Sequence, residues 1–174
     1  GTSGHFLKSQ GAGSQPVFAA AGGGKIGQVV STTKTDTATS TSTSLADMTG
    51  MTLNITPAAT SSKILVLADI KMMNTDGTAC IVSLLRDSTE IYIGDAASPR
   101  LRASTYVFGS HNREIWQQGI HFLDSPSSTS STTYKLQWKT ESSSTMYLNR
   151  GQDDSSGAFY PRYASSITAM EVLA

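Results

Sequence analysis

The segment from Ser61 to Arg86 decides the fold, and it reads SSKILVLADIKMMNTDGTACIVSLLR. Its first apolar run has the two-residue period of a strand, and both faces of that strand are apolar. Ile64, Val66, Ala68 and Ile70 form one face, and Leu65 and Leu67 form the other. Such a strand lies inside a sheet or sandwich and not at an edge. A second apolar run, from Ile81 to Leu85, follows the linker Asn74–Gly77, whose glycine suits the positive φ of a tight turn. We therefore predict a buried hairpin at the centre of an all-β domain.

Shorter segments on both sides of this hairpin also alternate apolar and polar residues. The expected strands are Lys25–Lys34, Met48–Ile55, Glu90–Gly94, Thr105–Phe108, Glu114–Asp124, Thr133–Glu141, Met146–Leu148 and Ser166–Leu173. The segment Thr35–Ser44 is almost entirely Thr and Ser, and it is either a long loop or a solvated strand. Helical periodicity is not found in any long window. The pattern predicts a jelly-roll-type β-sandwich of about eight to ten antiparallel strands.

The first 24 residues differ in composition from the rest, since they are rich in Gly and Ala. Such a stretch cannot form a core of its own, but Phe6, Leu7, Val17 and Phe18 are spaced along it as apolar anchors. We expect residues 1–24 to form an extended neck that packs on other copies of itself, and residues 25–174 to form the sandwich. A disordered tether is the alternative.

Composition argues against several classes of function. The chain has 174 residues, with 13 basic and 13 acidic side chains, so the basic excess of a nucleic-acid-binding protein is missing. A single cysteine, Cys80, lies in an apolar run, where we expect a small buried hydrophobe and not a reactive thiol. No apolar run approaches the roughly 20 residues that span a membrane. Because the chain begins with Gly and not Met, we expect a piece of a longer protein.

Signs of catalysis are weak. The three histidines, His5, His111 and His121, accompany no Gly-x-Ser-x-Gly nucleophile motif. Glycoside hydrolysis needs two converging carboxylates, and Asp153, Asp154 and Glu114 are available only if the fold brings them together. The Asp153–Asp154 pair could also ligate calcium, but it lacks the EF-hand spacing, so a solvated turn is favoured. We expect no enzyme, no cofactor and no metal.

Two polar segments carry the Tyr and Arg composition of contact surfaces. The first is the loop Asn149–Tyr163, with Asn149, Arg150, Gln152, Asp153, Tyr160, Arg162 and Tyr163. The second comprises Arg100, Arg102, Tyr106, His111, Asn112 and Arg113. Alternatives stay open for both segments: Phe159 and Tyr160 could anchor the loop or fill a trimer axis, and the second group of arginines could form salt bridges between subunits.

Several strand and turn phrases resemble tail-fibre and minor structural proteins of tailed phages. These phrases are Ile55–Pro57 with Ser61–Val66, Leu85–Thr89, Leu123–Pro126, Thr132–Leu136, Ile167–Glu171, Gly4–Gly13 and Pro16–Phe18. The resemblance implies a virion protein: a trimeric fibre that ends in a β-sandwich tip similar to tumour-necrosis-factor and C1q jelly rolls. It further implies attachment to a host-surface glycan or protein, with the N-terminal segment joined to other tail or capsid proteins. It assigns no site residues.

Two other functions compete with host attachment. A head fibre, decoration or tail adaptor protein would share the fold and bind no host. A polysaccharide depolymerase is disfavoured by the small size of the chain and by the lack of a long repetitive β-helix pattern. Trimerisation is expected on physical grounds too, because a sandwich with this little apolar content would gain from a shared core. Besides the neck anchors, Met146 and Tyr147 are candidates for lining the three-fold axis.

Overall fold

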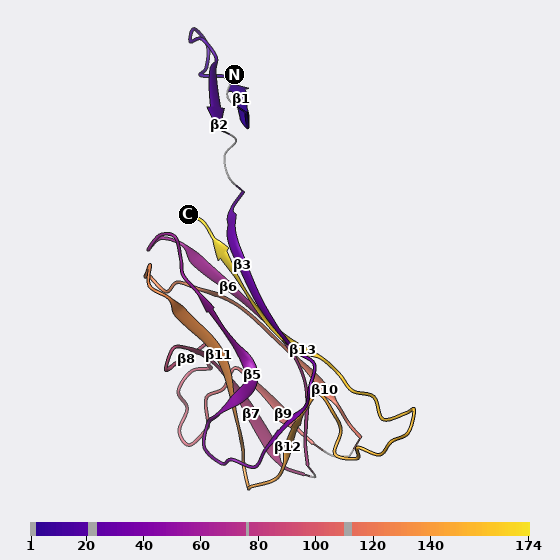
Figure 1. The fold of residues 1–174 in the computed structure, drawn as a ribbon. Coiled ribbons are helices and arrows are strands. Elements are labelled where there is room, and N and C mark those ends of the chain that lie inside the picture. Colours follow the sequence, from indigo (N-terminus) through magenta and orange to yellow (C-terminus); the bar gives the residue numbers. More distant parts are fainter. Residues whose placement is uncertain (1–2, 21–23, 76, 110–112) are drawn as a thin grey trace.

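The computed structural model describes residues 3–20, 24–75, 77–109 and 113–174, and these residues form thirteen strands and no helix. Within this part of the chain, accordingly, no helix is long and apolar enough to cross a membrane. Eleven strands form two packed sheets, and two form a separate N-terminal hairpin (Figure 1). The fold is an all-β sandwich of the jelly-roll type, with slightly more strands than the sequence predicts.

The six-stranded sheet is organised around β6 (Lys63–Asn74). One edge of β6 pairs with β10 (Trp116–Asp124), and the other pairs with β13 (Ser165–Val172) and β12 (Met146–Leu148). The outer strands are β3 (Ile26–Lys34), beside β13, and β4 (Ala38–Ser40), beside β12. The apolar residues on both faces of β6 therefore correspond to a central strand, as predicted.

The five-stranded sheet is organised around β7 (Ala79–Arg86) and β11 (Thr132–Thr140), which pair with each other. The far edge of β11 pairs with β5 (Ala46–Ile55). The far edge of β7 is shared by β8 (Thr89–Ile91) and β9 (Thr105–Phe108), which pair with successive parts of it. The strand predicted at Glu90–Gly94 starts one residue earlier and ends at Ile91, because Tyr92 has a φ of 53° that breaks the extended backbone.

The predicted central hairpin is wrong. β6 and β7 lie in different sheets, so the segment between them crosses the sandwich instead of closing a turn. Gly77 does have a positive φ, of 64°, but the amides of this segment bond to other segments: Thr75 N donates to Thr145 O, and Gly77 N to Gly109 O. Two consecutive apolar strands can bury their inner faces in either of two arrangements. They can lie side by side in one sheet, or they can face each other across the core in opposite sheets, as here.

The core lies between the two sheets and is formed by the alternate residues that the sequence assigns to it. Tyr134, Leu136 and Trp138 on β11 face the buried side of β6, and Met48, Met51 and Leu53 extend this core from β5. Cys80 is completely buried in the same cluster, and burial raises the pKa of its thiol to about 12. The expectation that Cys80 is a buried hydrophobe is confirmed.

The N-terminal segment forms a hairpin of β1 (His5–Lys8) and β2 (Val17–Ala20). Its four apolar anchors, Phe6, Leu7, Val17 and Phe18, are 43–61% exposed. Packing of this segment on other copies stays a prediction. The prediction that Met146 lines a three-fold axis is wrong, because Met146 is completely buried in the core of the single chain.

A candidate ligand-binding groove

A groove crosses the outer face of the five-stranded sheet over β9, β7 and β11. The strand register creates it from two parallel rows of side chains. In the first row Tyr106, Ile81 and Lys139 are direct cross-strand partners. In the second row Phe108 pairs with Ala79, and Glu141 N donates to Ala79 O at 2.9 Å. Each row therefore places an aromatic ring on one side, an aliphatic residue in the middle and a charged side chain on the other side.

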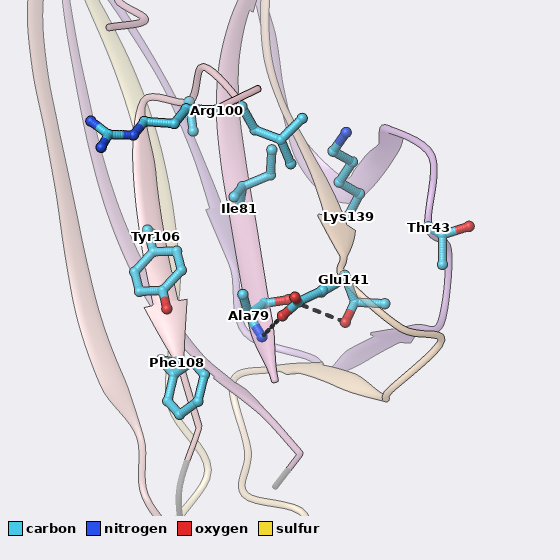
Figure 2. Close-up of a pocket in the computed structure, with 11 residues that line it drawn as sticks. Thr43, Ala79, Ile81, Arg100, Tyr106, Phe108, Lys139 and Glu141 are labelled. Atoms are coloured by element: carbon cyan, nitrogen blue, oxygen red, sulfur yellow. Dashed lines mark hydrogen bonds between the residues drawn. The ribbon is translucent and has the colours of Figure 1, made fainter. Parts of the chain in front are cut away.

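The hollow follows from side-chain size. The middle strand contributes Ala79 and Ile81, which are shorter than the side chains that flank them on β9 and β11. The resulting groove has a volume of about 680 Å³. Thr43, from the Thr- and Ser-rich segment, lies on its rim, and the loop with Arg100 and Leu101 closes one end (Figure 2).

The aromatic wall is exposed and flat. The rings of Tyr106 and Phe108 are stacked along β9, with centroids 6.5 Å apart and an interplanar angle of 23°. Tyr106 is 53% exposed and Phe108 is 45% exposed. Such rings offer their faces to the apolar face of a ligand, and their place on a strand holds them rigidly.

The charged side chains that line the groove have few or no partners among the described residues. Among the described residues, no hydrogen bond or ion pair engages the guanidinium of Arg100 or the ammonium of Lys139. Glu141 Oε2 accepts a long hydrogen bond of 3.4 Å from Ala79 N. Figure 2 shows Arg100 and Lys139 at the same end of the groove, on opposite sides of Ile81, and Glu141 near the other end.

The second predicted group of site residues is divided by the fold. Arg100 and Tyr106 both line the groove. Arg102 does not: its Nε donates to Gly94 O at 2.5 Å, beside a separate depression that Tyr92 and Phe122 also line. Arg113 lies against the loop Asn149–Tyr163 instead. His111 and Asn112 fall outside the described residues.

The first predicted group forms a network of ion pairs within the chain. Arg113 contacts Asp153 at 3.1 Å, donates to Tyr160 Oη, and stacks over the Tyr160 ring with its guanidinium carbon 4.5 Å from the centroid. Hydrogen bonds from Ser155 and then Arg113 lower the pKa of Asp153. Tyr160 is thus held by Arg113, from outside the loop, whereas Phe159, the other residue of the anchoring alternative, is 90% exposed.

Asp154 is the second acidic centre of this network. It pairs with Arg162 at 2.6 Å and with Arg150 at 3.5 Å, and Arg150 also stacks over Tyr147. The two aspartates therefore face arginines rather than a shared cation site. In the described part of the chain, no group of three or more His, Cys, Asp or Glu side chains is placed to hold a metal.

The other residues of this loop differ in accessibility. Gln152 is exposed, and Tyr163 is half-buried, with its amide donating to Asn149 O at 3.0 Å. Asn149 is completely buried; its amide group donates to the carbonyls of Lys34 and Asp36, so it holds the loop base and does not face solvent. Whether any residue of the loop binds a receptor stays a prediction.

Sequence reasoning missed most of the groove. Ile81 lies in the predicted hairpin, and Phe108 and Lys139 lie in predicted strands, but the sequence predicts none of them as a site residue. Outward-facing residues on three strands become neighbours only when the register between the strands is known. The local signal was limited to Arg100 and Tyr106.

Comparison with known proteins adds little. No protein-family model and no curated protein matches the chain. Among solved structures, that of infectious bursal disease virus Gx strain matches with 11% identity and a TM-score of 0.44, covering 98% of this chain and 42% of that one. The VP2 subviral particle of the same virus matches with 13% identity and a TM-score of 0.41, covering 97% and 42%. The chain thus spans less than half of the chains it matches, and at these values the likeness carries no conclusion about function.

Proposed function

We propose that this chain is the host-attachment tip of a phage tail fibre, that it works as a homotrimer, and that the groove on the five-stranded sheet contacts a host-surface glycan. The groove itself is the observation that carries the proposal. It combines an exposed pair of stacked rings with two cations that have no partner in the described chain. The setting in a virion comes from the resemblance of the strand and turn phrases to tail-fibre proteins.

A glycan suits this groove for two physical reasons. The C–H face of a sugar ring is apolar and packs on an aromatic face, while its hydroxyls bond to polar groups at the rim. Here the rings of Tyr106 and Phe108 supply the platform, and Lys139 and Glu141 supply the polar rim. Eleven residues line the groove, and Glu141 is the one carboxylate among them, so the paired acids of a glycosidase are not assembled there. Binding without cleavage fits this arrangement better than hydrolysis.

An apolar row on the opposite side of the sandwich supports the trimer. Val29, Met170, Leu65 and Leu123 are successive cross-strand partners over β3, β13, β6 and β10, and all four point away from the core. Val29 is 54% exposed and Leu123 is 44% exposed. The next row along the same strands is mostly polar, with Ser31, Thr168, Leu67 and His121. Because the outer face of an antiparallel sheet is usually polar, this row suits contact with a second copy.

Three grooves in one trimer would give multivalent attachment. Weak individual sites reach high overall avidity when several engage one surface together. A trimer through the six-stranded sheet would leave the groove accessible, because the groove lies on the other sheet.

The proposal is tested by native mass measurement and by binding to an array of immobilised bacterial surface polysaccharides. We expect a trimer, binding to at least one polysaccharide, and loss of that binding in Tyr106→Ala. Phe159→Ala is the matched control, since Phe159 is 90% exposed on the other loop. A trimer that binds no polysaccharide would contradict host attachment through glycans and favour a structural decoration or adaptor protein.

A further inference from the structure

We infer that the groove takes an acidic saccharide, with a carboxylate-bearing sugar on Tyr106 and a neutral sugar next to it on Phe108. This inference rests on the proposed function and specifies its ligand class. It follows from the distribution of charge between the two rows of the groove.

The first row and the adjoining loop are positive. Lys139 lies across Ile81 from Tyr106, and Arg100 lies at the same end of the groove (Figure 2). Both side chains lack partners among the described residues, although the chain as a whole has no net charge. A concave surface lined by one sign of charge attracts ligands of the other sign, and charge-assisted hydrogen bonds to a carboxylate are the stronger kind.

Seven of the eleven other basic side chains, all of them within the described residues, pair with an acid. The arginines at positions 113, 150 and 162 each pair with Asp153 or Asp154, and Arg86 pairs with Asp124. Lys135, four residues before Lys139 on the same face of β11, is also paired, with Asp47 at 2.8 Å. Arg100 and Lys139 thus lie on opposite sides of one end of the groove without an acidic partner, unlike most other cations in the described chain.

The second row carries the opposite charge. Glu141 lies across Ala79 from Phe108, two residues along the strand from Lys139, which corresponds to a separation of about 7 Å. Glu141 would repel a ligand carboxylate in this row, whereas it can accept a hydrogen bond from a sugar hydroxyl. The first row therefore favours an acidic sugar, and the second row, farther along β9, favours a neutral one.

Another copy of this chain is a poorer occupant. The apolar row suited to self-association lies on the six-stranded sheet, and the groove offers unpaired charges instead of a continuous apolar surface.

The test uses the full chain on an array that contains alternating acidic–neutral polysaccharides, each beside its methyl-esterified form, together with neutral polysaccharides. We expect binding to acidic members, at least about tenfold weaker binding after esterification, and a decrease in affinity as salt increases. Lys139→Gln and Arg100→Gln should each weaken acidic binding about tenfold. Lys63→Gln, an exposed cation on the other sheet, is the control.

The outcomes separate the two proposals. Equal binding to acidic and esterified forms that is lost in Tyr106→Ala would overturn the acidic class and keep glycan attachment. Unchanged acidic binding in both Lys139→Gln and Arg100→Gln would also overturn it. No binding to any polysaccharide would overturn the proposed function itself. The native mass and the unfolding midpoint of each variant establish that a lost affinity reflects the groove and not the fold.

Discussion

Gly109 shows how a single residue permits the crossing between the sheets. It lies just after β9, and a Cβ atom built on it would be 1.8 Å from the carbonyl oxygen of Asn74 at the end of β6. Its own carbonyl accepts the amide of Gly77 at 2.8 Å. Since the obstructing atom belongs to the backbone, it cannot rotate away, so a side chain at position 109 must displace one of the two segments.

We therefore expect Gly109→Ala to lower the free energy of unfolding by about 1–3 kcal/mol, the usual cost of overpacking. Gly94→Ala is the matched control, because a Cβ at Gly94 meets nothing within 4 Å and should change stability by less than about 0.5 kcal/mol. Guanidinium denaturation at a fixed protein concentration measures both. Equal stabilities of the two variants would contradict the close approach at Asn74.

A second residue-scale feature is the buried carboxylate of Glu171, which is 1% exposed. It accepts hydrogen bonds from Gln28 Nε2 at 2.8 Å and from Ala58 N at 2.6 Å. The bond from Gln28, followed by that from Ala58, lowers the pKa of Glu171 below its usual 4.5. Folding thus favours the charged form. The stabilisation is present above pH 4.5 and is lost as the pH falls through the lowered pKa of the folded state.

Glu171→Gln should consequently make stability less dependent on pH. We expect the variant to be less stable than the wild type at pH 7 and the difference to shrink as the pH falls below 4.5. Thermal unfolding at a series of pH values measures this, with Asp95→Asn as a control on an exposed carboxylate. A difference that stays constant from neutral to acid pH would show that the charge of Glu171 does not contribute.

At the scale of elements, the two sheets are joined at one end by a buried polar cluster. Asp124, the last residue of β10, accepts two hydrogen bonds from Arg86 Nη1 at 2.9 and 3.0 Å, and one from Tyr134 Oη at 2.6 Å. Arg86 and Tyr134 belong to the other sheet, and Asp124 is only 5% exposed. Burial, followed by the hydrogen bond to Asp124, strongly raises the pKa of the Tyr134 hydroxyl, so it remains a hydrogen-bond donor.

Removing one side chain of the Arg86–Asp124 pair should lower the free energy of unfolding more than removing both. We expect Arg86→Met to lower stability by about 3 kcal/mol, at the low end for a broken buried pair because the Arg86 side chain is 29% exposed. The double variant Arg86→Met, Asp124→Leu should recover part of this loss, since no unpaired charge stays buried. A double-mutant cycle by chemical denaturation measures the coupling, and additive losses would contradict it.

Most of the elements themselves were predictable, and their pairing was not. β11 matches the predicted strand Thr133–Glu141 to within one residue at each end and buries alternate residues, because alternation on a strand is a local property. The predicted hairpin failed since an apolar run carries no information about which sheet it joins. The site was predictable only at Arg100 and Tyr106, which lie close together in the chain.

At the scale of the whole molecule, the sandwich has two outer faces of different character. The six-stranded sheet presents the apolar row of Val29, Met170, Leu65 and Leu123, and the five-stranded sheet presents the groove. In the proposed trimer the first face joins the copies and the second meets the host.

A charge in the apolar row should therefore dissociate the trimer. We expect Leu123→Glu to give a monomer by native mass measurement, because a carboxylate buried between copies would lose its hydration. Thr52→Glu, an exposed position on the other sheet, should leave the mass unchanged. If Leu123→Glu keeps the wild-type mass, the row is not the contact between copies. Groove affinity for a single immobilised saccharide should persist in the monomer while avidity is lost.

The sequence by itself determined the all-β class, the positions of nearly all strands and the residues that face the core. It could do so because the two-residue alternation and the chemistry of burial act within each strand. Only the tertiary structure decided that β6 and β7 lie in opposite sheets, that Arg113 joins the loop of Asp153, and that Tyr106, Ile81 and Lys139 form one row. These outcomes depend on strand pairing and register, which are set by hydrogen bonds between segments far apart in the chain.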